Sequence, residues 1–138
     1  MSGEPAGRAA ALPSDDDRRF WKRAFGAYLV VLGAISGAAY LRILPRWIAV
    51  IPYLDAGAHF ILLGLASYLS HRALGGRRIG RLPLGPLVVG AVAVTDEIVQ
   101  AFVPWRTFSA LDMAGNLGGV VLFGALAVRA VNASPKRA

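Results

Sequence analysis

The sequence contains no cysteine and only two histidines, His59 and His71. Without cysteine the chain forms no disulfide and offers no thiolate ligand to a metal ion. Two histidines are too few for the usual zinc site, which takes several His or Cys ligands. The sequence therefore predicts no metal site, and it leaves any cofactor unknown.

Acidic residues are also scarce, with 8 Asp and Glu against 15 Lys and Arg in 138 residues. The net charge of +7 would suit nucleic acid, but the basic residues lie in the gaps between apolar runs and not on one amphipathic face. With 56% hydrophobic residues and a mean hydropathy of +0.53, the chain is too apolar for an ordinary soluble domain. We therefore predict membrane lipid, and not nucleic acid, as its partner.

Four apolar runs organise the chain. As a helix, the first run is about 30 Å long, which is enough to cross the hydrocarbon core of a bilayer. The predicted fold class is all-α: an integral membrane four-helix bundle over residues 21–132, between a disordered cytoplasmic tail (1–20) and a short cytoplasmic tail (133–138). The four runs are 24–44, 54–70, 82–103 and 111–131.

Glycines mark two features of these runs. The Gly75–Gly76 pair is expected to end the second helix. Gly115, Gly118 and Gly119 are expected to allow close packing of the fourth helix.

The distribution of positive charge predicts the orientation of this bundle. All but three of the 15 Lys and Arg residues fall on the side that holds both termini and the linker between the second and third runs. The exceptions are Arg42, Arg46 and Arg106. Because basic residues accumulate on the cytoplasmic side, both termini are predicted to be cytoplasmic, in a multi-pass protein of the inner (plasma) membrane.

A polar layer interrupts the apolar runs on the opposite, outer side. Ionisable side chains at membrane depth cost at least ~2.5–3.5 kcal/mol each, and they are usually paired or used in function. On the predicted topology, every acid outside the N-terminal tail falls in this outer layer. The polar residues of the layer are Asp55, His59, Asp96, Glu97, Gln100, Arg106, Asp112 and Asn116.

Three of these residues are candidates for catalysis. Asp55 and His59 lie one helical turn apart, which suits a general base oriented by an acid. Glu97 is the deepest strong acid and is a candidate proton donor. The alternative for Asp55 and His59 is that both bridge helices by hydrogen bonds, and the alternative for Glu97 is a place beside Arg106. Asp96 points about 100° away from Glu97 on a helix, and we do not assign it to the site.

Four further residues are candidates for substrate binding. Arg106 suits an anionic headgroup or phosphate, or alternatively offsets a nearby acid. Asp112 shares a helix face with Asn116, but an acid at that position also suits a helix N-cap. Gln100 and Asn116 are equally suited to interhelical hydrogen bonds. His71, in the basic linker, is expected to be solvated.

The segment DEIVQAFVPWRTFSALDMAGNLGG (96–119) resembles the signature of the VanZ-like family, and DAGAHF (55–60) resembles its Asp-x-x-x-His-Phe element. The resemblance implies a four-helix bacterial membrane protein of the cell envelope. The family is named for a member associated with low-level teicoplanin resistance, and its biochemical activity is not established. The sequence departs from many members at Ala56, where they have Lys, and at Trp105, where they have Gly.

Three functions are compatible with these residues. The first is a VanZ-like envelope protein whose outer pocket handles an anionic lipid, a cell-wall precursor or a glycopeptide and so contributes to glycopeptide resistance. The second is an intramembrane hydrolase or transferase that uses Asp55, His59 and Glu97 in acid–base chemistry, or a metal held by these residues and Asp112. The third is a proton-coupled transporter subunit, which with only four spans would require a homo-oligomer. The sequence leaves open whether the chain is an enzyme.

Overall fold

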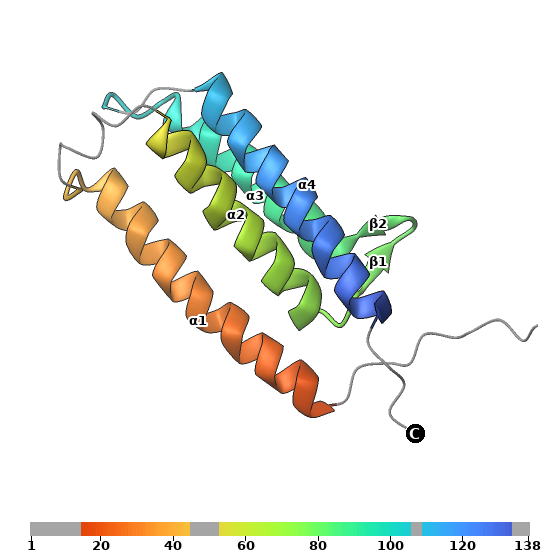
Figure 1. Cartoon of the computed structure of the whole chain (residues 1–138). Coiled ribbons are helices and arrows are strands. Elements are labelled where there is room, and N and C mark those ends of the chain that lie inside the picture. Colours follow the sequence, from red (N-terminus) through yellow and green to blue (C-terminus); the bar gives the residue numbers. More distant parts are fainter. Residues whose placement is uncertain (1–14, 45–52, 106–108, 134–138) are drawn as a thin grey trace, which may run out of the picture.

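The structure, a computed structural model, describes residues 15–44, 53–105 and 109–133, which form four helices and one small β-ribbon (Figure 1). This confirms the prediction of an all-helical chain with four helices. The ribbon was not predicted; it lies between α2 and α3, where β1 (Arg78–Ile79) pairs antiparallel with β2 (Leu82–Pro83). The helices are α1 (Asp15–Tyr40), α2 (Leu54–Ala73), α3 (Leu84–Gln100) and α4 (Ala110–Ala133).

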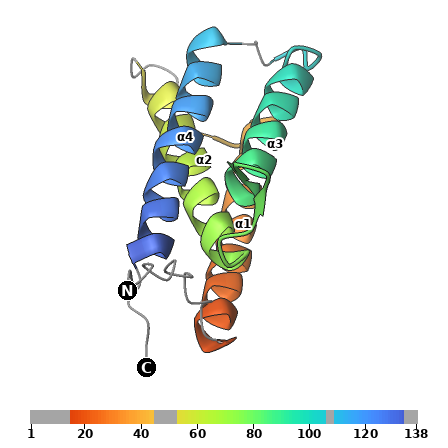
Figure 2. The same cartoon turned by 90° about the vertical axis from the view of Figure 1, so that its right-hand side faces the viewer.

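Helix α2 is the centre of the arrangement, because it packs against α1, α3 and α4, and most extensively against α4. Helices α2 and α4 run in one direction, and α1 and α3 run in the other (Figure 2). The first turns of α2 and α4 therefore lie at one end of the bundle, which we call the site end (Figure 1). The β-ribbon, the start of α1 and the end of α4 lie at the opposite end, which we call the ribbon end.

Glycines of α4 let its backbone approach α2. A Cβ atom on Gly119 would overlap the carbonyl oxygen of Phe60, and one on Gly115 would lie 2.6 Å from that of Ala56. The predicted close packing is thus confirmed at these two glycines, whereas a Cβ on Gly118 would make only ordinary contact with the Phe60 ring, at 3.5 Å.

The interior is unusual in polarity. The buried apolar side chains are small, and the largest fully buried ones are polar: His71, Glu97, Asn116 and Ser67. Large apolar side chains lie outside, with Phe102 82% and Val30 73% exposed. Helices α1 and α4 are each long and apolar enough, by length and composition, to cross a membrane. Ser67 shows how the interior is satisfied, since its hydroxyl donates to the carbonyl oxygen of Val120 at 2.9 Å.

Several predicted boundaries are corrected by the structure. Residues 15–20, expected in the disordered tail, form the first turns of α1, which begins at Asp15. Helix α3 is shorter than the predicted run 82–103, because residues 82–83 pair in the ribbon and residues 101–105 form turns. Predictions for residues 1–14, 45–52, 106–108 and 134–138 lie outside the described residues.

His71 is not solvated, contrary to the prediction. It is 1% exposed in the last turn of α2. The chain turns back over it, with Gly75 and Gly76 at positive φ and the Gly76 N–H donating to the His71 carbonyl at 3.0 Å. The start of α3 also packs against His71, since a Cβ on Gly85 would lie 2.5 Å from the His71 backbone nitrogen. The glycine pair was expected to end α2, and this is confirmed, but the burial of the turn was not foreseen.

Candidate functional site

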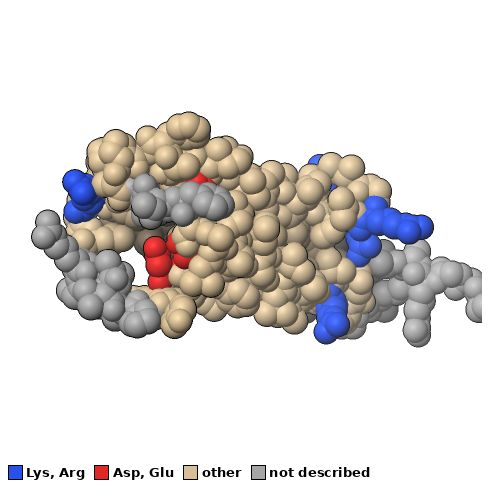
Figure 3. All heavy atoms as spheres, turned by 90° about the horizontal axis from the view of Figure 1, so that it is seen from above, with Lys and Arg blue, Asp and Glu red and all other residues tan. Residues whose placement is uncertain are grey.

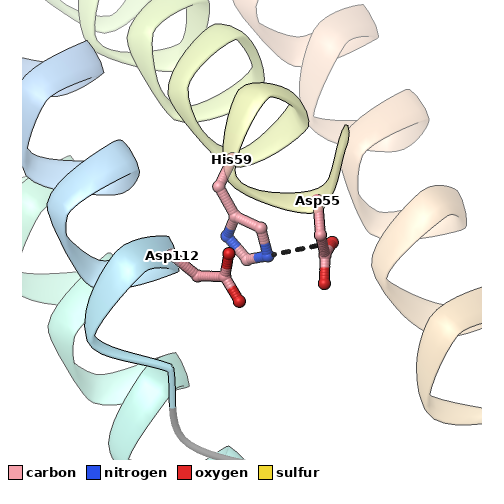
Figure 4. Close-up of side chains that lie close together, drawn as sticks. All are labelled: Asp55, His59 and Asp112. Atoms are coloured by element: carbon pink, nitrogen blue, oxygen red, sulfur yellow. Dashed lines mark ion pairs between the residues drawn. The ribbon is translucent and has the colours of Figure 1, made fainter. Parts of the chain in front are cut away.

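Asp55 and His59 meet at the start of α2, as their spacing predicts. Asp55 lies in the first turn and His59 one turn later, with 3.6 Å between the Asp55 Oδ1 and His59 Nε2 atoms (Figure 4). The Asp55 side chain is 75% exposed and that of His59 is 15% exposed. The imidazole is thus largely buried, whereas the neighbouring carboxylate is exposed.

Asn116 of α4 fixes the orientation of the His59 ring. Its Oδ1 atom lies 2.9 Å from the His59 Nδ1 atom, and Asn116 is itself buried. An amide oxygen only accepts hydrogen bonds, so Nδ1 carries the proton of this bond. In the neutral imidazole, Nε2 then has a lone pair and faces Asp55.

Asp112 brings a second carboxylate to the same place. It lies one turn before Asn116, at the start of α4, and points toward His59 (Figure 4). Asp55, His59 and Asp112 each offer one ligand atom, and these atoms all lie within 4.8 Å of one another. We call these three residues the Asp–His–Asp cluster. Within the described part of the chain, they are the group that could hold a metal ion.

Ser109, and not Asp112, caps α4. The Ser109 hydroxyl accepts the backbone N–H of Asp112 at 3.2 Å. The N–H of Ser109 donates to the Glu97 carboxylate at 2.9 Å. In a capping box, the acid three residues after the cap would take that N–H. Here the Glu97 carboxylate of α3 accepts the Ser109 N–H instead. The Asp112 side chain therefore does not fold back onto the cap and points toward His59 (Figure 4).

Glu97 and Gln100 lie in helix interfaces apart from the cluster. Glu97 is fully buried; one carboxylate oxygen accepts from Ser109, and the other has no hydrogen-bond partner among the described residues. The Gln100 amide donates to the Asp96 carboxylate at 2.8 Å. The predicted site is therefore divided: Asp55, His59, Asp112 and Asn116 converge, whereas Glu97 and Gln100 make interhelical and intrahelical contacts. Arg106 lies outside the described residues.

Asp96 has a role that the sequence did not indicate. Its carboxylate accepts the Tyr40 hydroxyl at 2.8 Å and so ties the end of α1 to α3. The Trp105 indole N–H donates to the Tyr40 carbonyl at 3.1 Å, and the Arg42 guanidinium lies 5.3 Å from the centre of the Trp105 ring. The only sequence signal for this contact was aromatic residues at the ends of apolar runs.

Outside the first turn of α1, where Asp15, Asp16 and Asp17 lie at the ribbon end, acidic and basic side chains are concentrated at opposite ends of the bundle (Figure 1, Figure 3). On the face shown in Figure 3, acidic side chains appear at the site end and most Lys and Arg side chains at the opposite end. The acidic side chains at the site end belong to the polar layer predicted from the sequence.

No protein-family model, curated protein or solved structure matches the chain, so the resemblance to the VanZ-like family rests on the sequence motifs alone.

Proposed function

We propose that the chain is a multi-pass protein of the bacterial inner membrane, with both termini cytoplasmic and the site end facing outward. The inverted polarity of the bundle carries this proposal. Burying polar side chains such as Glu97 and Asn116 while exposing Phe102 and Val30 is unfavourable in water but suits lipid, where helices associate through small residues and polar contacts.

The ribbon end supports the cytoplasmic assignment. Its arginines include Arg72, whose guanidinium lies 4.5 Å from the centre of the Trp21 ring, and Trp21 packs edge-on against Tyr68. Aromatic side chains beside basic ones are typical of the membrane–water interface, and arginine prefers the cytoplasmic side. Arg78 in the exposed β-ribbon adds to the same charge.

At the outer face, we infer that the Asp–His–Asp cluster and Asn116 handle a polar molecule of the cell envelope. The class includes lipid headgroups, lipid-linked cell-wall precursors and glycopeptides, in keeping with the resemblance to the VanZ-like family. The convergence of His59 with two carboxylates and a buried amide supports a binding role, because ionisable groups at membrane depth are costly and are usually paired or used in function.

Single-cysteine labelling tests the membrane topology, since the natural chain has no cysteine. Tyr53→Cys places a thiol at the site end and Ile79→Cys places one in the ribbon, at positions 78% and 59% exposed. In cells with a permeabilised outer membrane and an intact inner membrane, a membrane-impermeant maleimide should label Tyr53→Cys. It should label Ile79→Cys only after lysis of the inner membrane. Equal labelling of both variants in intact cells, or of neither, would contradict the topology.

Teicoplanin susceptibility tests the function of the site. Expression in a susceptible bacterium should raise the inhibitory concentration, and His59→Gln should abolish this effect at equal membrane abundance. Asp16→Asn, which changes an exposed acid at the far end of α1, is the matched control and should behave as the wild type. Loss of the phenotype together with loss of protein in His59→Gln would instead indicate a structural histidine.

A second candidate function is acid–base catalysis in a hydrolase or transferase. The orientation of His59 favours it, because the Asn116 contact leaves Nε2 as the basic atom on the open side of the site. Incubation of the purified protein with a lipid-linked cell-wall precursor, followed by mass spectrometry, tests for turnover. A product that forms with the wild type and not with His59→Gln would support catalysis over binding alone.

A further inference from the structure

We propose that the Asp–His–Asp cluster binds one divalent cation of the zinc class through one atom each of Asp55, His59 and Asp112. The remaining coordination positions face the site end, where they would accept an anionic oxygen of the envelope ligand. The cation site is argued from geometry, and only its use for an envelope ligand rests on the proposed function.

The spacing of the three ligand atoms leaves room for an ion. The 3.6 Å between Asp55 Oδ1 and His59 Nε2 is too long for a hydrogen bond, so no shared proton ties this pair. Around a metal with bonds of ~2.0–2.2 Å, neighbouring ligand atoms lie about 3–3.5 Å apart. The three ligand atoms all lie within 4.8 Å of one another, and rotation of the exposed Asp55 side chain can shorten its distances to the other two.

The contact with Asn116 is independent evidence for a ligand at His59 Nε2. A metal-binding imidazole almost always donates its other ring N–H to an acceptor that fixes its tautomer and direction. Here the acceptor is the Asn116 amide oxygen, 2.9 Å from Nδ1, on a side chain that is 2% exposed. The close approach of α4 at Gly115, one residue earlier, holds that amide in place against α2.

The ligand set indicates the kind of metal and of site. One imidazole with two carboxylates suits zinc and its neighbours better than calcium or magnesium, which prefer oxygen alone. Three protein ligands leave at least one open position, as in zinc sites that bind a water or a substrate. The exposure of Asp55 places that position toward the surroundings of the bundle.

A bound cation also removes a conflict of charge in the proposed function. Two carboxylates at one site repel a phosphate or carboxylate ligand. A divalent cation offsets their two negative charges and offers a direct bond to an anionic oxygen. The cluster thereby becomes suited to an anionic headgroup even though its own side chains are acidic.

Calorimetric titration of zinc chloride into the full chain, stripped of metal in detergent micelles, tests the site. We expect one equivalent to bind, with affinity reduced at least about 10–100-fold in Asp55→Asn, His59→Ala and Asp112→Asn, since a direct ligand should matter as much as an outer-shell partner. Asp16→Asn is the matched control, an exposed aspartate in the first turn of α1 at the ribbon end, and should bind as the wild type does.

Unfolding temperatures separate loss of the ligand from loss of the fold. Asp55→Asn alters an exposed side chain, so its unfolding temperature without metal should equal that of the wild type. Cobalt in place of zinc should give visible absorption bands that disappear in His59→Ala.

Two results would overturn the cation site: no saturable binding of one equivalent, or binding that all three variants retain. Either result, combined with the expected cysteine labelling and teicoplanin phenotype, would leave the proposed function standing without a metal. Metal binding at the cluster with no teicoplanin phenotype would uphold the site and reject its use in glycopeptide resistance.

Discussion

The Glu97 carboxylate accepts a hydrogen bond of 2.9 Å from the backbone N–H of Ser109. Through this bond α3 holds the residue that caps α4, and the Ser109 hydroxyl in turn accepts the N–H of Asp112. Glu97, the most buried acid among the described residues, therefore organises the start of α4, and the less buried Asp112 lies in the candidate site.

Glu97→Ala should destabilise the protein. Removing the carboxylate leaves the Ser109 N–H without its acceptor, which costs about 1–3 kcal/mol when the group is buried. Glu97→Gln retains an oxygen acceptor and should cost less. Thermal unfolding in detergent, followed by tryptophan fluorescence, measures both effects. A Glu97→Ala protein with unchanged stability but no phenotype would instead favour the predicted catalytic role of Glu97.

Gly119→Ala should weaken the contact between α2 and α4. The added methyl group would meet the Phe60 carbonyl, and such overpacking costs about 1–3 kcal/mol. Gly118→Ala is the matched control, since its methyl group would make only ordinary contact with the Phe60 ring. The same unfolding assay distinguishes them. Equal effects of the two substitutions would contradict the close approach at Gly119.

The Tyr40–Asp96 contact should appear as coupling in a double-mutant cycle. Tyr40→Phe removes the donor and Asp96→Ala removes the acceptor of one hydrogen bond, so their effects on unfolding free energy should be non-additive by about 0.5–3 kcal/mol. Tyr28→Phe is the control, because the Tyr28 hydroxyl donates to the Leu62 carbonyl of α2. Combined with Asp96→Ala, it should be additive to within about 0.5 kcal/mol.

His71 should make stability depend on pH. It lies beyond the apolar run 54–70, and burial, together with the nearby Arg78 and Arg72, lowers its pKa below the usual 6.5. As the pH falls below 6.5, the unfolded chain therefore binds a proton that folded His71 does not bind, and the free energy of unfolding decreases.

The His71 contribution is at most about 1.4 kcal/mol per pH unit for one proton. It begins below the unfolded pKa and ends once the pH passes the lowered folded pKa. Unfolding measured between pH 7 and 5 should show a shallower pH dependence in His71→Gln than in the wild type. Identical pH dependence in the two proteins would show that His71 binds protons equally in the folded and the unfolded chain.

The sequence by itself determined the helices and the pairs within them. The apolar runs predict four helices, and Gly75 and Gly76 predict the end of α2, because these features act over a few neighbouring residues. Spacing of four residues likewise brings Asp55 to His59, since one turn of a helix fixes that relation. The ribbon was missed because two residue pairs carry too short a pattern to detect.

Tertiary structure alone decided which pairs meet. The contacts of a helix depend on its rotation about its axis and its position along that axis. The spacing of residues within one helix determines neither. The close approach of α4 to α2 brings Asn116 to His59, whereas the packing of α3 against the start of α4 places the Glu97 carboxylate on the Ser109 N–H. His71 is polar and follows an apolar run, so its sequence context suggested solvent; the turn at Gly76 and the start of α3 enclose it.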